Sequence, residues 1–127
     1  MKKTLVAVLV GTSVLGSQLW ADAQVPTKTW SIRVKVNPKN TSGDAWDPLG
    51  GAPDIWLCTS SSLGNKCVAE SARCQDSFEC SFSMTLPYTF TARVYDYDAL
   101  DHDLIGSCYV TKADTYACGS ATLTASN

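Results

Sequence analysis

Apolar and polar residues alternate along several short stretches of this chain, and this alternation constrains the fold more than any other feature. In Trp30–Val36, Trp, Ile and two Val residues alternate with Ser, Arg and Lys, as a strand with one buried face requires. Phe78–Leu86 and Tyr88–Asp96 repeat the pattern, and no longer segment carries the spacing of an amphipathic helix. The sequence therefore predicts an all-β fold.

Short strands can be placed between turn-rich segments along the whole chain. They cover Trp30–Val36, Asp54–Cys58, Lys66–Ser71, Phe78–Leu86, Tyr88–Asp96, Ile105–Thr111 and Ala121–Ala125. This spacing predicts an antiparallel β-sandwich of about seven to eight strands, with Trp30 and Trp56 in its core. Because successive loops alternate between the two ends of such a sandwich, we expect the loops at 37–53, 73–76 and 97–103 at the same end.

The first residues of the chain have the features of a secretory signal peptide of the bacterial type. Lys2 and Lys3 precede an apolar run, Leu5–Leu15, and Ala21 and Ala23 place small residues where a signal peptidase reads them. The apolar run is too short to remain as a membrane-spanning helix. We therefore expect residues 1–23 to be removed after Ala23, and residues 24–127 to form one secreted or periplasmic domain.

Six cysteines lie in the part that we expect to be exported. They are Cys58, Cys67, Cys74, Cys80, Cys108 and Cys118. An even number of cysteines in an exported chain favours disulfides, although six cysteines allow fifteen pairings. Spacing favours pairing between sequence neighbours, since each such pair flanks a short turn or loop. The single histidine, His102, and the absence of a Cys-x-x-Cys motif argue against a zinc site.

Aspartates concentrate in two short segments, 44–54 and 96–103. Seven of the 12 acidic residues lie there: Asp44, Asp47, Asp54, Asp96, Asp98, Asp101 and Asp103. Two unit charges about 5 Å apart repel by roughly 3 kcal/mol at an effective dielectric near 20, so such a cluster is tolerated when it binds a cation or extends into water. The predicted topology brings both segments to one end, which favours calcium, an ion bound by oxygen ligands. The basic residues form no comparable run, so a nucleic-acid partner is not expected.

The two acidic segments resemble the first and third loops of the C2 domain, the calcium-dependent phospholipid-binding β-sandwich. Residues 47–54 place an Asp, a glycine-rich bend and a second Asp before a strand. Residues 94–106 combine an apolar strand end, Asp-Tyr-Asp, and a later Asp before Leu-Ile-Gly. The resemblance implies calcium ligands at Asp47, Asp54, Asp96, Asp98 and Asp103. It leaves Asp44 and Asp101 outside this set, either supporting the ligands or simply exposed.

The same resemblance implies that the loop tips approach a membrane, where calcium bridges lipid phosphates. The apolar residues nearest those tips are Trp46, Leu49 and Leu100, although Trp46 and Leu49 could instead pack against the base of their own loop. The chain departs from the family in having one residue fewer between Asp98 and Asp103 than many members. It also replaces a family segment with the Cys74–Cys80 loop, and shows seven strands where the family has eight.

Together these features predict an exported calcium-binding module that binds anionic phospholipid headgroups as a peripheral protein. One alternative is a calcium-stabilised structural or protein-binding module without lipid binding, and another is a cation-free sandwich that acts through an edge strand. The chain carries no His-Glu-x-x-His, no Gly-x-Ser-x-Gly and no phosphate loop, so we do not expect an enzyme. His102 lies among acids and is expected to be an exposed loop residue.

Overall fold

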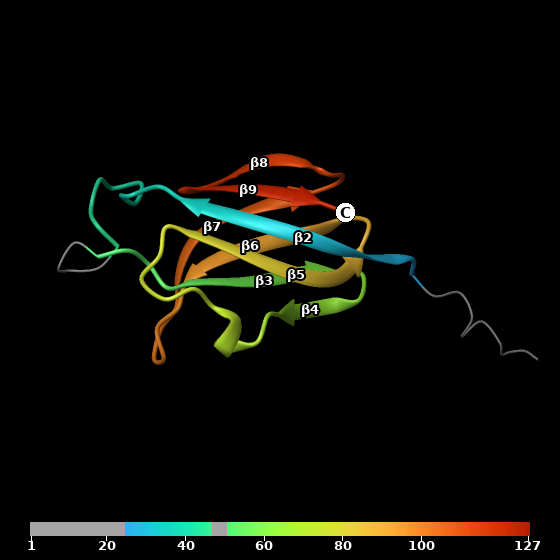
Figure 1. Cartoon of the computed structure of the whole chain (residues 1–127), viewed down its shortest axis with the longest axis horizontal. Helices are drawn as coiled ribbons and strands as arrows, with labels where there is room; N and C mark the ends of the chain where they lie inside the picture. The colour runs from blue at the N-terminus through green and yellow to red at the C-terminus, as the bar shows by residue number, and fades with distance from the viewer. Residues whose placement is uncertain (1–24, 47–50) are drawn as a thin grey trace, which may run out of the picture.

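Two four-stranded antiparallel sheets stack face to face in the part of the chain that the computed structural model describes, residues 25–46 and 51–127 (Figure 1). The strands are β2 (Thr27–Val36), β3 (Ile55–Ser61), β4 (Gly64–Cys67), β5 (Glu79–Pro87), β6 (Phe90–Asp96), β7 (Asp103–Val110), β8 (Asp114–Cys118) and β9 (Ala121–Ser126). One sheet has the order β5-β2-β9-β8 and the other β4-β3-β6-β7. The predicted all-β antiparallel sandwich is therefore confirmed. The expected signal peptide, Asp47 and Leu49 lie outside the described residues.

The core lies between the sheets and is built by the alternating residues of the strands. In β2, Trp30, Ile32, Val34 and Val36 are buried while the residues between them are exposed or half-buried. The Trp30 indole N–H donates a hydrogen bond of 3.0 Å to the Pro87 carbonyl, so its one polar atom is satisfied inside the core. The predicted strands with strict alternation are thus found with the expected face inward.

Two strands differ from their predictions because they bury little. The predicted strand Lys66–Ser71 is wrong: the strand is β4, whose four residues are all exposed, and a 3-10 helix, η1 (Glu70–Ala72), follows it. The sequence also missed β8, an edge strand in which only Cys118 is fully buried. With β8, the described residues contain eight strands, which is the number that C2 domains have.

The expectation that Trp56 lies in the core is also wrong. Its neighbours Ile55 and Leu57 are fully buried, and since successive side chains of a strand point to opposite faces, Trp56 lies half-buried on the outer face of β3. Three consecutive apolar residues, Ile-Trp-Leu, cannot reveal by themselves which face is the buried one.

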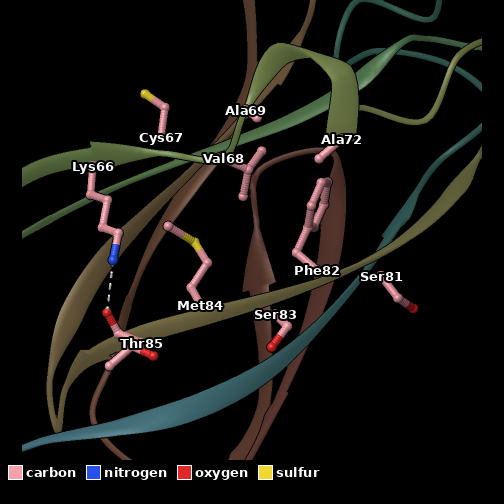
Figure 2. Close-up of a pocket in the computed structure, with 10 residues that line it drawn as sticks. All are labelled: Lys66, Cys67, Val68, Ala69, Ala72, Ser81, Phe82, Ser83, Met84 and Thr85. Carbon is pink, nitrogen blue, oxygen red and sulfur yellow. Dashed lines mark hydrogen bonds between the residues drawn. The ribbon is translucent and has the colours of Figure 1, made fainter.

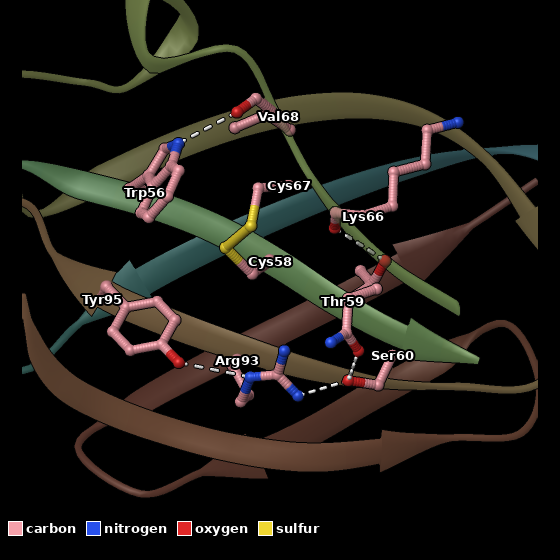
Figure 3. The surroundings of a disulfide bond; sticks show 10 residues. Trp56, Cys58, Thr59, Ser60, Lys66, Cys67, Val68, Arg93 and Tyr95 are labelled. Atoms are coloured by element: carbon pink, nitrogen blue, oxygen red, sulfur yellow. Dashed lines mark hydrogen bonds between the residues drawn. A yellow bond between two sulfur atoms is a disulfide. The ribbon is translucent and has the colours of Figure 1, made fainter. Parts of the chain in front are cut away.

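The three disulfides join sequence neighbours, as predicted: Cys58–Cys67, Cys74–Cys80 and Cys108–Cys118. The first links residues directly opposite each other on β3 and β4 (Figure 3). The last joins β7 of one sheet to β8 of the other. Cys74 bonds to Ile55 of β3 through two backbone hydrogen bonds of 2.8 and 3.0 Å, while its disulfide partner lies on β5. Two disulfides therefore close opposite lateral edges of the sandwich.

Residues 37–46 and 51–54, 73–78 and 97–102 lie at the same end of the sandwich, as predicted for their loops (Figure 1). Backbone hydrogen bonds connect them: Tyr97 N–H donates to the Asp54 carbonyl at 2.8 Å, and Ser77 N–H donates to the Pro53 carbonyl at 2.9 Å. No helix within the described residues is long and apolar enough to cross a membrane.

Candidate functional site

Three of the predicted calcium ligands lie side by side because neighbouring strands begin or end there. Asp54 immediately precedes β3, Asp96 ends β6 and Asp103 begins β7. The strand registers pair Ile55 with Asp96, and Asp96 with Asp103. The Asp54 N–H donates a 2.9 Å hydrogen bond to Asp96 Oδ1. The sheet ladder therefore holds these acids close together.

A fourth acid, Asp76, joins this group and was missed in the sequence. Its N–H donates a 2.8 Å hydrogen bond to Asp54 Oδ1, and its own Oδ1 accepts one of 3.0 Å from Ala52 N–H. Asp76 has a positive φ of 48°, a conformation that Asp tolerates better than most residues. The available signal was its loop, 73–76, which the predicted topology already placed at this end. We call the end that carries Asp54, Asp76, Asp96 and Asp103 the acidic pole.

The tip of the β6–β7 loop is held by short-range hydrogen bonds. Asp98 Oδ1 accepts from Leu100 N–H at 3.0 Å, and Asp98 N–H donates to His102 Nδ1 at 3.1 Å. Asp98, Leu100 and Asp101 are exposed, with Leu100 at 96% exposure. His102 is not exposed, contrary to the prediction: it lies half-buried, with its ring 4.9 Å from Trp56. The imidazole packs against Trp56 on the outer face of β3 instead of extending into water.

Tyr97, between two predicted ligands, positions this loop. Its ring meets Trp56 edge-on at 5.4 Å, and the Arg73 guanidinium lies 4.4 Å above it. Its hydroxyl donates a 2.6 Å hydrogen bond to Glu70 Oε1. That hydrogen bond to a carboxylate raises the pKa of Tyr97 above 10.0, and partial burial and the Glu70 charge act in the same direction. The Asp-Tyr-Asp segment is thus fixed by η1 and β3 through its central aromatic residue.

The first acidic loop is described only in part. Asp44 is exposed, and its N–H donates a 3.0 Å hydrogen bond to Asn40 Oδ1. Trp46 is half-buried against the core, and its indole N–H donates 2.8 Å to the Asn37 carbonyl. Trp46 therefore packs against the base of its own loop, which was the alternative to an exposed position at the loop tip. Trp46 and Asp103 also line one cleft of about 240 Å³, so this loop adjoins the acidic pole.

The acidic pole offers donors of the right chemistry for calcium, but the described side chains do not form a preformed site. Within residues 25–46 and 51–127, no three His, Cys, Asp or Glu side chains lie close enough together to hold a metal ion. In the same residues, no lysine or arginine forms an ion pair with Asp54, Asp76 or Asp103. A bound cation would therefore need side-chain rotation, or a ligand from the undescribed Asp47. Both oxygens of a carboxylate accept, so one hydrogen bond leaves capacity for an ion.

The lateral edge between β4 and β5 offers a different kind of site. A groove of about 390 Å³ opens there, with Phe82, Met84 and Val68 along it (Figure 2). The Lys66 side chain crosses the groove, and its Nζ donates a 3.2 Å hydrogen bond to the Thr85 carbonyl of β5. A lysine that occupies a carbonyl of an edge strand opposes pairing with another chain. The groove therefore gives little support to the alternative that the sandwich acts through an edge strand.

Comparison with known proteins adds no functional assignment. No protein-family model and no curated protein sequence matches the chain. Among the solved structures that match is the crystal structure of a C2 domain protein from Ramazzottius varieornatus, with 15% sequence identity, a TM-score of 0.39, and coverage of 79% of this chain and 88% of that one. A TM-score this low does not support an inference about the function of this chain. The description of the fold as a C2-like β-sandwich rests on its two four-stranded sheets and on its loop motifs.

Proposed function

We propose that this protein binds calcium at the acidic pole and, in the calcium-bound state, binds anionic phospholipid headgroups. The observation that supports the proposal is the convergence of Asp54, Asp76 and Asp96, linked by hydrogen bonds from a backbone N–H of one to a carboxylate oxygen of the next, with Asp103 opposite Asp96. Carboxylates gathered at one end of the sandwich repel one another, and a divalent cation bound by several of them would reduce that repulsion.

Calcium is the cation that fits these donors best. Carboxylate and carbonyl oxygens on irregular backbone suit its variable coordination number. Protein zinc sites are built mainly from sulfur and nitrogen ligands, but all six cysteines are in disulfides and the chain has a single histidine. Extracellular calcium modules bind with dissociation constants of roughly 0.1–1 mM, so a site that forms only when its side chains rotate is compatible with export.

Charge supports the dependence of lipid binding on calcium. The chain has a formal net charge of −2, and its acids gather at the end proposed to face the membrane, so without calcium an anionic surface repels it. Bound calcium would lower the local negative charge and bridge to lipid phosphates. Leu100 at the tip of the β6–β7 loop is exposed and able to insert among headgroups. Leu49 keeps the same predicted role, although it lies outside the described residues.

The second candidate is a calcium-stabilised structural or protein-binding module that does not bind lipid. It is favoured by Trp46, whose indole is held against the sandwich by its hydrogen bond to Asn37. A tryptophan held in this way contributes less to membrane insertion than a free one. In this version calcium orders the loops of the pole and the lipid surface has no part.

Thermal unfolding of residues 24–127 in EDTA and in 10 mM calcium tests the ion. At about tenfold excess over the dissociation constant, selective binding to the native state adds about 1.4 kcal/mol, which raises Tm by roughly 6 °C or more. Asp54→Asn with Asp96→Asn should abolish this shift. The matched control is Asp114→Asn, an acid at the opposite end of the sandwich. An unchanged wild-type Tm rules out both calcium candidates.

Co-sedimentation with phosphatidylserine vesicles separates the two candidates. We expect calcium-dependent binding by the wild type, and weaker binding by Leu100→Ser at an unchanged calcium-induced Tm shift. Phosphatidylcholine vesicles provide the neutral-surface control. If calcium raises Tm but leaves the protein in the supernatant with phosphatidylserine, the structural module replaces the lipid-binding one.

A further inference from the structure

The outer face of the β4-β3-β6-β7 sheet places Arg93 at the centre of an array of outward-facing side chains. Arg93 on β6 lies opposite Cys58 on β3 and Ser107 on β7. The next outward-facing residues along the strands complete the array: Trp56, Tyr95 and Leu104 on one side, where a register shift places Leu104 opposite Tyr95, and Ser60, Thr91 and Tyr109 on the other. The intervening residues of β3 and β6 face inward and are buried. We call these outward residues the Arg93 array.

No member of the Arg93 array is acidic, although the chain as a whole is. Arg93 Nε donates to the Tyr95 hydroxyl at 3.2 Å, and Nη1 donates to Ser60 Oγ (Figure 3). In the described residues no carboxylate lies within ion-pair distance of it, whereas Arg33 on the other sheet is paired with Glu79 at 2.6 Å. A guanidinium has five N–H donors, so these two contacts fix its position and leave donors for a ligand.

The chemistry around this fixed cation is aromatic and hydroxylic. Trp56 and Tyr95 lie next to each other with ring centroids 6.1 Å apart, and Tyr109 at the opposite corner is 59% exposed. Thr91 lies between Ser60 and Tyr109 across the strands and supplies a hydroxyl group that can both donate and accept. The Ser60 hydroxyl already donates to Asn65 Oδ1 at 2.9 Å and accepts from Arg93, so it offers one further acceptor position. A ligand that matches the array therefore presents a carboxylate, apolar C–H surface and hydroxyl groups close together.

The dimensions of the array favour a small ligand over a folded protein. Three adjacent strands span about 10 Å, and the distance from Trp56 to Ser60 along β3 is about 14 Å. A stable protein–protein interface needs roughly 800 Å² from each partner, which a surface of this size does not supply. A short chain of sugar rings fits both the dimensions and the chemistry.

We propose that the Arg93 array binds an oligosaccharide that contains uronic acid. Arg93 binds the carboxylate through its remaining donors, in the planar geometry that a guanidinium offers. The C–H face of a sugar ring lies on Tyr95 or Trp56, and ring hydroxyls bond to Thr91 and donate to the remaining lone pair of Ser60. None of the predicted calcium ligands belongs to the array, so this site does not require the proposed function at the acidic pole.

The test is a titration of ¹⁵N-labelled residues 24–127 with short oligomers of galacturonic, glucuronic and mannuronic acid, followed by NMR. EDTA is present throughout, because uronates also bind calcium. We expect saturable shifts confined to β3, β6 and β7 with at least one oligomer. Loss of charge-assisted hydrogen bonds predicts at least about tenfold weaker binding for Arg93→Gln. The matched control Arg33→Gln, also an outward strand arginine, should bind like the wild type.

Further probes identify the ligand chemistry. The methyl ester of the bound oligomer should bind at least about tenfold more weakly, and a hexaglutamate peptide should bind more weakly than the free uronate oligomer. The proposal is overturned if no oligomer gives saturable shifts, or if the shifts map elsewhere. Equal binding of the methyl ester, of hexaglutamate or of Arg93→Gln overturns it as well. Because calcium is absent, none of these results depends on the acidic pole.

Discussion

Gly106 in β7 is predicted to be the least replaceable small residue of the fold. A Cβ atom at this position would lie 1.8 Å from the Cys118 carbonyl oxygen and 2.3 Å from its carbonyl carbon. These are backbone atoms of the last residue of β8, so no side chain can rotate away to make room. The Cys108–Cys118 disulfide and the hydrogen bond from Ser120 N–H to the Ile105 carbonyl, at 3.1 Å, hold the two sheets together there.

The magnitude follows from the separation that an alanine would require. An ordinary contact begins near 3.4 Å, so the backbone of β7 would have to move away by about 1.6 Å. Interiors are close-packed, and overpacking against flexible neighbours already costs about 1–3 kcal/mol. Against fixed backbone we expect Gly106→Ala to cost at least about 3 kcal/mol, or at least about 12 °C in Tm.

Urea unfolding at equilibrium, with the disulfides intact, measures this cost. Gly64→Ala is the control: its φ is +96°, but a Cβ there meets nothing within 4 Å. This control therefore carries only the backbone strain of a left-handed residue, about 1–2 kcal/mol. If Gly106→Ala loses no more stability than Gly64→Ala, the close approach of the two sheets at Cys118 is wrong.

Three further predictions concern residues around the acidic pole and the lateral edge between β4 and β5. Because the pKa of Tyr97 is raised, its contribution to stability is present below pH 10 and is lost as pH rises through the folded-state pKa. Glu70→Gln should return that pKa toward 10.0 in an ultraviolet titration, and an unchanged titration would contradict the hydrogen bond. Replacing Cys74 and Cys80 by serine should cost about 2 kcal/mol in urea unfolding and weaken the calcium-induced Tm shift, whereas an unchanged shift would mean that the disulfide does not position Asp76. Lys66→Ala should leave Tm within about 3 °C but promote self-association in sedimentation velocity, because it frees a carbonyl of β5; a wild-type sedimentation profile would refute that role.

The sequence predicted the parts of this fold in which local pattern and burial agree. The alternation in β2 and β6 is strict, since each strand has one face in the core and one toward solvent. The pattern fails where a strand buries little, as in β8, or where both faces carry apolar residues, as at Trp56. The disulfide pairs were predictable because each closes a local loop.

The acidic pole could be predicted only in part, because its acids come from three separate loops. The resemblance to the C2 loop motifs implied Asp54, Asp96 and Asp103, which lie at or next to strand ends, and the predicted topology placed their loops together. Asp76 stands outside any acidic run, and its place beside Asp54 depends on a positive φ and on backbone hydrogen bonds. The packing of His102 against Trp56 has the same origin: contacts between residues far apart in sequence leave no local pattern.

The way in which the β6–β7 loop is held bears on how calcium could bind. The loop does not depend on its carboxylates alone for its position, because Tyr97 anchors it to Trp56, Arg73 and Glu70. Asparagine also keeps the acceptor oxygens that Asp96 and Asp98 use in the loop. An ion would then have to reorient aspartate side chains but not order the backbone, and the entropy of ordering a loop is a large part of what binding costs. It follows that substituting the aspartates by asparagine should remove the ion without unfolding the pole, whereas Tyr97→Ala should weaken calcium binding although it removes no ligand.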